Sequence, residues 1–235
     1  MNIVFPKSKI FFSDLILQRT DGLIKCGGRE ALNRWMKGKK KIELIDFLLA
    51  NNKYEKFMKI TMDKYLEEID EFLDIFNTKK VNNIISIGPG NGVFELILLK
   101  KIKFNKILLI DIENTKHQYH GFNKKGSGYS CLKDTKFFFI SNNIPSNSII
   151  ICNPTINNLP KFEYDLAFSL FSMGFHYPCN QYVNYLIENA KKDSKIILDK
   201  RKCSIDEGYK ILLKNFKLIK KIPKIKHYRV LLCKK

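Results

Sequence analysis

The stretch NNIISIGPGNGVFELILL, residues 82–99, joins two apolar runs of different periodicity through three closely spaced glycines. The first run, NIISIG, is short and continuous, which is typical of a buried strand. The second, VFELILLKKI, has the length of a helix. Gly88, Gly90 and Gly92 lie between them, where glycine permits unusual backbone angles and a close approach to a ligand. The stretch therefore predicts a strand-to-helix turn beside a binding site.

The chain after this turn continues as strands that alternate with helices. Further strands are expected at KILLIDIE (106–113), SIIICNP (148–154), YDLAFSLF (164–171) and SKIILDK (194–200), and two more around Pro223 in residues 216–235. Helices are expected at 180–192 and at 204–215, with Ser204 as N-cap, whereas 130–143 fits either a strand or a helix. Seven strands, with helices between the first six, predict an α/β fold with a doubly wound sheet and a C-terminal β-hairpin.

The N-terminal part is expected to be mostly helical. In MDKYLEEIDEFLDIF, residues 62–76, apolar positions recur three and four residues apart, with acids on the opposite face. A second helix is expected at 42–52, and turns are expected at Asp21-Gly22 and Gly27-Gly28. We therefore divide the chain into a helical segment, 1–80, and a sheet domain, 81–235.

The composition indicates a folded chain of 235 residues, with 45% hydrophobic residues and no apolar run near the ~20 residues that span a bilayer. The start of the chain lacks the pattern of an export signal. Six scattered cysteines contain no CxxC pair, so neither a zinc site nor a disulfide framework is expected. A cytoplasmic location without membrane insertion is the expectation, and the oligomeric state is left open.

The net charge of +19 permits two interpretations. A basic surface attracts nucleic acid and other polyanions. However, 37 of the 42 basic residues are lysines spread along the whole chain, and an A/T-biased coding sequence would produce the same excess. Arginine, whose fork binds phosphate in a bidentate manner, is scarce.

The glycine turn resembles a known family motif. Gly88-Pro89-Gly90-Asn91-Gly92 is G-x-G-x-G, whereas the dinucleotide fingerprint G-x-G-x-x-G needs a glycine at the position of Val93. G-x-G-x-G after a strand resembles the first motif of class I S-adenosylmethionine-dependent methyltransferases, which have a Rossmann-like sheet. Asp111 ends the second strand, 19 residues after Gly92, where the resemblance implies an acid that binds both ribose hydroxyls. The resemblance covers residues 82–235.

The same resemblance implies the contacts of the cofactor, S-adenosylmethionine. Ser86 stands where the family commonly has Asp or Glu, and Asn153 would pair with the adenine edge or else only form an Asn-Pro turn. The residues implied to bind the cofactor are Ser86, Gly88, Pro89, Gly90, Asn91, Gly92, Asp111, Ile112, Cys152, Asn153 and Ser169.

The loop SLFSMGFHYP, residues 169–178, lies where this family positions the methyl acceptor. His176 is the candidate catalytic base, because a neutral imidazole can take a proton from an acceptor hydroxyl. Phe175 and Tyr177 are expected to stack on the substrate, although His176 and Tyr177 can also be structural residues of the loop. The run Gly-Phe-His-Tyr-Pro is similar to one in bacterial sugar O-methyltransferases, with Met173 in place of a tryptophan.

Other patterns carry less weight. CNPT, residues 152–155, lacks the second proline and the aromatic residue of the Asn-Pro-Pro-aromatic motif of nucleic-acid amino-methyltransferases. His117 and His120 have no complementary ligands at suitable spacing, so no metal is expected. Asp199-Lys200-Arg201 follows the fifth strand and is a candidate for the acceptor side.

The sequence thus predicts a methyltransferase that acts on a hydroxyl of a sugar, a glycan or a related small molecule. An RNA- or DNA-directed methyltransferase that uses the lysine-rich surface is the alternative. A cofactor-binding scaffold without turnover is the third hypothesis.

Overall fold

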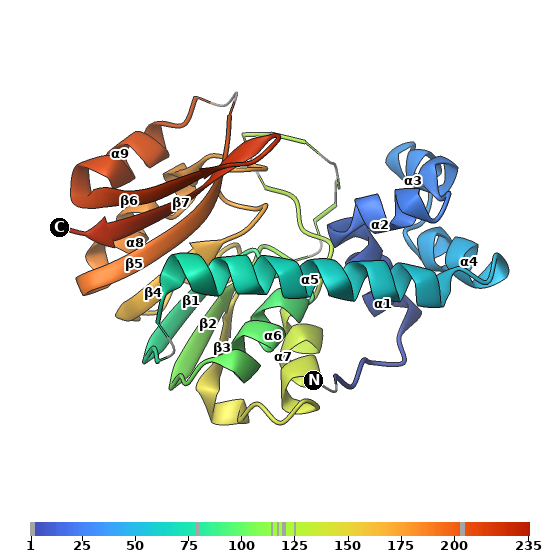
Figure 1. Ribbon diagram of the computed structural model, residues 1–235, viewed down its shortest axis with the longest axis horizontal. Helices are drawn as coiled ribbons and strands as arrows, with labels where there is room; N and C mark the ends of the chain where they lie inside the picture. Colours follow the sequence, from blue (N-terminus) through green and yellow to red (C-terminus); the bar gives the residue numbers. More distant parts are fainter. Residues whose placement is uncertain are drawn as a thin grey trace.

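The computed structural model describes residues 3–78, 80–113, 115–116, 118, 121–124, 126–202 and 205–235. In this part of the chain a single seven-stranded sheet has the order β3-β2-β1-β4-β5-β7-β6 (Figure 1). The strands are β1 (Asn83–Ile87), β2 (Lys106–Ile110), β3 (Ile149–Cys152), β4 (Tyr164–Ser169), β5 (Ala190–Arg201), β6 (Phe216–Pro223) and β7 (His227–Lys234).

The pairing confirms the predicted fold class. Strands β1 to β5 are parallel to one another, while β7 is antiparallel to both β5 and β6. The C-terminal hairpin therefore inserts its last strand between β5 and β6. The strand order reverses between β1 and β4, which is the place where open α/β sheets bind their ligands.

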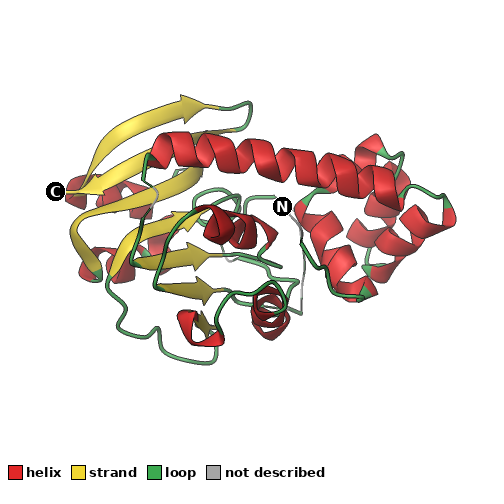
Figure 2. Cartoon of the chain, turned by 60° about the horizontal axis from the view of Figure 1, so that its bottom comes forward, coloured by secondary structure: helices red, strands yellow, loops and turns green. Residues whose placement is uncertain are grey.

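Helices cover both faces of the sheet (Figure 2). Helices α6 (Val93–Lys101) and α7 (Leu132–Ile140) belong to one apolar core, and α8 (Val183–Glu188) and α9 (Glu207–Asn215) contribute to the other. The ambiguous segment 130–143 thus contains a helix. Contrary to the prediction, no helix joins β3 to β4, because residues 153–163 form a loop.

Two details at the turns of the sheet domain complete the connections. The short 3-10 helices η1 (Ser146–Ser148) and η2 (Cys179–Gln181) precede β3 and α8. Helix α9 has Asp206 as its N-cap, whose carboxylate accepts the backbone N–H of Tyr209 at 3.1 Å. Ser204, the predicted cap, lies outside the described residues.

The N-terminal segment forms five helices in its described part: α1 (Lys9–Gln18), α2 (Thr20–Lys25), α3 (Arg29–Met36), α4 (Ile42–Ala50) and α5 (Tyr54–Phe76). The turn predicted at Asp21-Gly22 is wrong, because both residues lie in α2. A Cβ at Gly22 would be 3.1 Å from the Phe57 ring, so this glycine permits close packing of α2 on α5. The turn at Gly27-Gly28 is confirmed between α2 and α3.

Helix α5 connects the two parts of the chain. It begins eight residues before the predicted 62–76 stretch and runs alongside one face of the sheet (Figure 1). The Phe72 ring contacts Phe94 of α6 and Phe168 of β4, with centroids 5.4 Å and 5.3 Å away. The N-terminal helices and this face of the sheet therefore share one hydrophobic core.

Candidate active site

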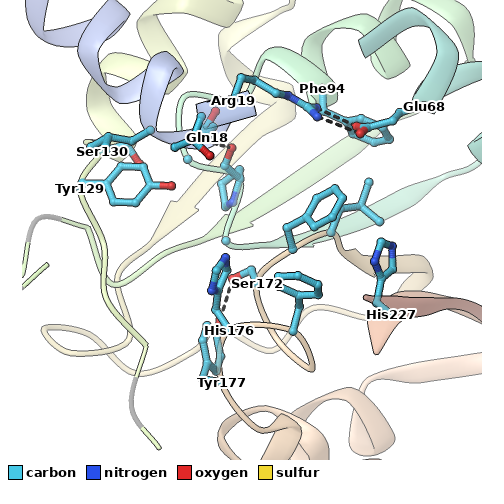
Figure 3. A pocket seen from close by; sticks show the side chains of 18 of the residues that line it. Gln18, Arg19, Glu68, Phe94, Tyr129, Ser130, Ser172, His176, Tyr177 and His227 are labelled. Atoms are coloured by element: carbon cyan, nitrogen blue, oxygen red, sulfur yellow. Dashed lines mark hydrogen bonds and ion pairs between the residues drawn. The ribbon is translucent and has the colours of Figure 1, made fainter. Parts of the chain in front are cut away.

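A cavity of about 820 Å³ lies at the carboxyl ends of the parallel strands. Its walls come from five places: the α1–α2 junction and α5, the glycine turn after β1, the end of β2 with the segment that follows it, the loop after β4, and the ends of β5 and β7 with the connection before β7 (Figure 3). Among the predicted site residues, the cavity is lined by Gly88, Pro89, Gly90, Asp111, Ile112, Phe175, His176 and Tyr177. The strand ends of the sheet therefore determine where the cavity lies, and the N-terminal helices form part of its wall.

The glycine turn and the second-strand acid lie side by side. The backbone N–H of Gly90 donates to Oδ2 of Asp111 at 3.3 Å, and the N–H of Glu113 donates to Oδ1 at 3.0 Å. Burial raises the pKa of Asp111 to about 6, although these backbone donors favour the ionised form. The two features that the sequence linked through the family motif thus meet in one place.

The second half of the glycine turn makes contacts with α1 and α7. Asn91 is buried, and its Nδ2 donates to the carbonyl oxygen of Phe11 at 2.8 Å, which attaches α1 to the turn. Gly92 has a φ of 72°, and a Cβ there would be 2.6 Å from both Thr135 and Phe139 of α7. Neither residue lines the cavity, and their role in cofactor binding stays a prediction.

Ser86 does not line the cavity, but it is hydrogen-bonded to a cavity residue that the sequence analysis did not identify. Its hydroxyl donates to Oε1 of Glu95 at 2.7 Å. Glu95 is 4% exposed, lines the cavity, and has its pKa raised to about 7 by burial. Glu95, in the first turn of α6, therefore places a carboxyl group beside the end of β1. The sequence signal that could have identified Glu95 is its position, three residues after the last glycine of the turn, Gly92.

Three further predicted contacts belong to the framework. Asn153 donates through Nδ2 to Oε2 of Glu113 at 2.8 Å, and its Oδ1 accepts from the backbone and hydroxyl of Thr155, which matches the turn interpretation. Ser169 is fully buried, donates to the carbonyl oxygen of Ile87 and accepts from the N–H of Met173. Cys152 is buried as well. None of the three lines the cavity.

The loop after β4 holds His176 at the cavity wall (Figure 3). Its Nδ1 is 2.8 Å from the carbonyl oxygen of Gly121. Because a carbonyl oxygen can only accept, the neutral ring carries its proton on Nδ1, and Nε2 is the basic nitrogen. Burial lowers the pKa of His176, which favours the neutral form. The arrangement suits a base.

The two aromatic neighbours of His176 differ in accessibility. Phe175 is partly exposed and contacts the rings of His176, Phe171 and His227 edge to face. Tyr177 is 7% exposed, and its hydroxyl accepts from Ser172 at 3.0 Å. Phe175 is therefore available to a ligand, while Tyr177 mainly supports the loop.

The N-terminal helices place an ion pair opposite this loop. Arg19 binds Glu68 of α5 through two hydrogen bonds of 2.8 Å and 2.7 Å, and its guanidinium lies 3.8 Å from the centre of the Tyr65 ring. Gln18 lies next to the glycine turn, with its Nε2 3.4 Å from the carbonyl oxygen of Pro89. No local sequence signal identified these residues, because their partners are distant in the chain.

The C-terminal hairpin contributes a buried charge cluster. Asp199 of β5 accepts two hydrogen bonds from Arg229 of β7, at 2.8 Å and 2.9 Å, and lies 3.4 Å from Nε2 of His227. Burial opposes ionisation of Asp199, but His227 and Arg229 outweigh it and lower its pKa. Of the Asp199-Lys200-Arg201 set, Arg201 is the member that lines the cavity.

Two absences concern the described part of the chain. Within it, no group of three or more His, Cys, Asp or Glu residues is arranged to hold a metal ion. His117 and His120 lie outside the described residues. Among the helices that the structure describes, none has the combined length and apolarity required to cross a membrane.

No protein-family model and no curated protein matches the chain, whereas many solved structures share its fold. A ribosomal protein L11 methylase from Lactobacillus delbrueckii subsp. bulgaricus has a TM-score of 0.52 and 13% identity, over 73% of this chain and 76% of that one. N-methyltransferase NodS from Bradyrhizobium japonicum WM9, in complex with S-adenosyl-L-homocysteine, gives 0.53 and 8% over 74% and 87%. StiE O-MT gives 0.53 and 11% over 78% and 77%. The chain therefore has the Rossmann-like α/β fold of the class I methyltransferases.

Proposed function

We propose that the protein is an S-adenosylmethionine-dependent methyltransferase that acts on a hydroxyl of a sugar, a glycan or a related small acceptor. One observation carries the proposal. The Asp111 carboxylate lies within 3.3 Å of the Gly90 backbone nitrogen, and both residues line the cavity at the switch point of the sheet. A carboxylate beside a glycine turn at this place suits a nucleoside with two vicinal hydroxyls.

The donor set fits this cofactor. The cavity volume of about 820 Å³ is within the usual range for small-molecule sites. Asp111 would accept from the ribose hydroxyls, Ile112 would contact the adenine, and the backbone from Gly88 to Gly90 would lie along the methionine part. Asp111 places negative charge at this end, and Glu95 adds a second carboxyl group there. When bound, the cofactor would supply a methyl group activated by a positively charged sulfur.

The remaining task of the protein is to position the acceptor, exclude water and accept a proton. His176 provides the proton acceptor through Nε2, oriented by the contact of Nδ1 with Gly121. The proposed role of the segment 1–80 is to cover the cavity and select the acceptor, because Gln18, Arg19 and Glu68 contribute to its wall.

The structural neighbours support the cofactor more than the acceptor. NodS is described as an N-methyltransferase in complex with S-adenosyl-L-homocysteine, and the Lactobacillus protein as a ribosomal protein methylase. These names cover different acceptors on one fold. The choice of a hydroxyl acceptor therefore rests on His176 and on the resemblance of the loop 169–178.

The first experiment is calorimetric titration of the full chain with S-adenosylmethionine and with S-adenosylhomocysteine. We expect saturable binding of both, weakened in Asp111→Asn. Failure of both ligands to bind would contradict the proposal. The second experiment follows labelled methyl transfer to a panel of sugars, glycans and RNA.

The panel also decides between the alternatives. Transfer to sugars supports the proposal, and binding of the cofactor without transfer to any acceptor would favour the scaffold. Transfer to RNA, with affinity that falls steeply as salt rises, would favour the nucleic-acid methyltransferase.

A further inference from the structure

The two ends of the cavity carry opposite charge. The acids Asp111 and Glu95 lie at the glycine turn. The opposite end is formed by β5, β7 and the connection before β7, and its titratable cavity-lining side chains are all basic. They are Arg201, Lys224, Lys226, His227 and Arg229. In the described part of these elements, no acidic side chain lines the cavity.

The sheet register brings this basic end together. Arg201, the last residue of β5, is paired with His227, the first residue of β7. The Arg201 guanidinium lies 5.3 Å from the centre of the Phe175 ring, and the His227 ring lies 5.4 Å from it. His176 contacts the same ring, with its centroid 4.9 Å away. Phe175 therefore lies between the candidate base and two basic side chains.

The carboxylates that face the cavity from the other elements are already engaged. Glu68 of α5 is bound by Arg19, and Asp21 of α2 pairs with Lys64. Behind the wall, Glu71 and Asp199 pair with Lys224 and Arg229. These pairs neutralise the acids of α2, α5 and β5, so positive charge is in excess near Phe175, on the side of Arg201 and Lys226.

We propose that the methyl acceptor carries an anionic group, a carboxylate or a phosphate, that the basic end of the cavity binds. The proposal rests on the proposed function. The acceptor ring lies against Phe175, its anionic group faces Arg201, Lys226 and His227, and its hydroxyl faces His176. The positively charged cofactor would lie against the acidic end of the cavity and the negatively charged acceptor against the basic end. Each ligand would thus have a charge complementary to the side chains around it.

The direct test compares acceptors that differ only in charge. Calorimetry of the full chain, saturated with S-adenosylhomocysteine, measures 3-hydroxybenzoate against 3-hydroxybenzamide, and glucose 6-phosphate against glucose. We expect the anionic member of at least one pair to bind about tenfold more tightly, because a hydrogen bond to a charged group is the stronger kind. Equal affinities within both pairs, or no binding of either anion, would overturn the proposal.

Variants locate the binding groups. Arg201→Gln and Lys226→Gln should each weaken binding of the preferred anion about tenfold, with little effect on its neutral partner. Lys220→Gln, which removes an exposed charge of β6 outside the cavity, is the matched control and should leave both affinities unchanged. An equal loss in all three variants would indicate a general charge effect and contradict a local site.

The measurements distinguish a failure of the proposed function from a failure of the anionic-acceptor inference. Binding of S-adenosylhomocysteine is measured in the same variants and should remain within about twofold of the wild type, since the variants lie at the opposite end. Loss of cofactor binding in the wild type would remove the proposed function. Normal cofactor binding without a preference for anions would remove this inference alone. Displacement of the anion by single-stranded RNA at low salt would assign the basic end to a polyanion and overturn the small anionic acceptor.

Discussion

The hydroxyl of Ser86 donates to the carboxylate of Glu95 at 2.7 Å, across the turn that separates β1 from α6. The family motif commonly has its acid at the position of Ser86. Here a carboxyl group comes from the following helix, so this end of the cavity has an acidic side chain although its place in the sequence has changed. The pair is buried, and burial raises the pKa of Glu95 to about 7.

Replacement of Glu95 should change how stability depends on pH. Folded Glu95 keeps its proton up to about pH 7, whereas the ordinary value of 4.5 applies after unfolding, so the folded state binds more protons in this window. Stability therefore falls as pH rises. Relative to Glu95→Gln, the wild type should lose up to about 3 kcal/mol of unfolding free energy between about pH 4.5 and about pH 7. Urea unfolding at several pH values measures this difference.

Ser86→Ala is the matched control for the same pair. Its hydrogen bond favours the ionised form of Glu95, so its removal should raise the pKa of Glu95 further and extend the loss of stability to higher pH. A wild type and a Glu95→Gln variant with parallel pH curves would show that burial of Glu95 is not coupled to its ionisation.

Gly92→Ala should destabilise the fold through contact with α7. An alanine at positive φ costs about 1–2 kcal/mol by itself. At Gly92 the added Cβ would also lie 2.6 Å from two side chains of α7, which adds about 1–3 kcal/mol of overpacking. Gly38→Ala is the control, because Gly38 has a φ of 93° and nothing within 4 Å of its Cβ position. Chemical unfolding should show a clearly larger loss for Gly92→Ala, and equal losses would refute the packing role.

Asp111→Asn should weaken binding of S-adenosylhomocysteine by about 10- to 100-fold, because the carboxylate that we propose accepts from both ribose hydroxyls becomes an amide. The affinity of the wild type should also rise with pH through about 6, where Asp111 ionises. Calorimetry at several pH values tests both effects. A variant that keeps wild-type affinity, with the same pH profile, would exclude Asp111 from the site.

His176→Gln should lower turnover about 100-fold or more and leave the affinity for S-adenosylhomocysteine within about twofold. Because burial lowers the pKa of His176, the acidic limb of the rate profile should lie below its ordinary value of 6.5. Methyl-transfer rates across the pH range, on whichever acceptor the panel identifies, provide the measurement. Unchanged turnover in the variant would leave the loop 169–178 without a base.

The fold was predictable because its signals are local. Continuous apolar runs mark the buried strands, and the apolar periodicity of 62–76 marks the C-terminal part of α5. The segment 130–143 stayed ambiguous, since its run of three phenylalanines suits a strand as well as a helix. The turn expected at Asp21-Gly22 failed because packing of Gly22 against Phe57 outweighs the local turn preference.

The site was predictable only where a motif fixes the backbone. Asp111 and the glycine turn meet because neighbouring parallel strands end at the same edge of the sheet. Asn153 and Ser169 are polar residues at strand ends as well, yet their hydrogen bonds are used within the framework. The contacts of Gln18, Arg19 and His227 depend on segments that lie far apart in the sequence, and no spacing rule reports such contacts.

The rod-like continuity of α5 limits how this protein can diversify. Tyr65 and Glu68 border the cavity, while Phe72, two turns or less further along, is fixed between Phe94 and Phe168. The N-terminal helices are consequently not an independent module: a replacement set of helices from another protein would have to reproduce the sheet-facing rings as well. Changes in the shape of the cavity are easier to accommodate in the strand-end loops, which can be lengthened or reshaped while α5 stays in place.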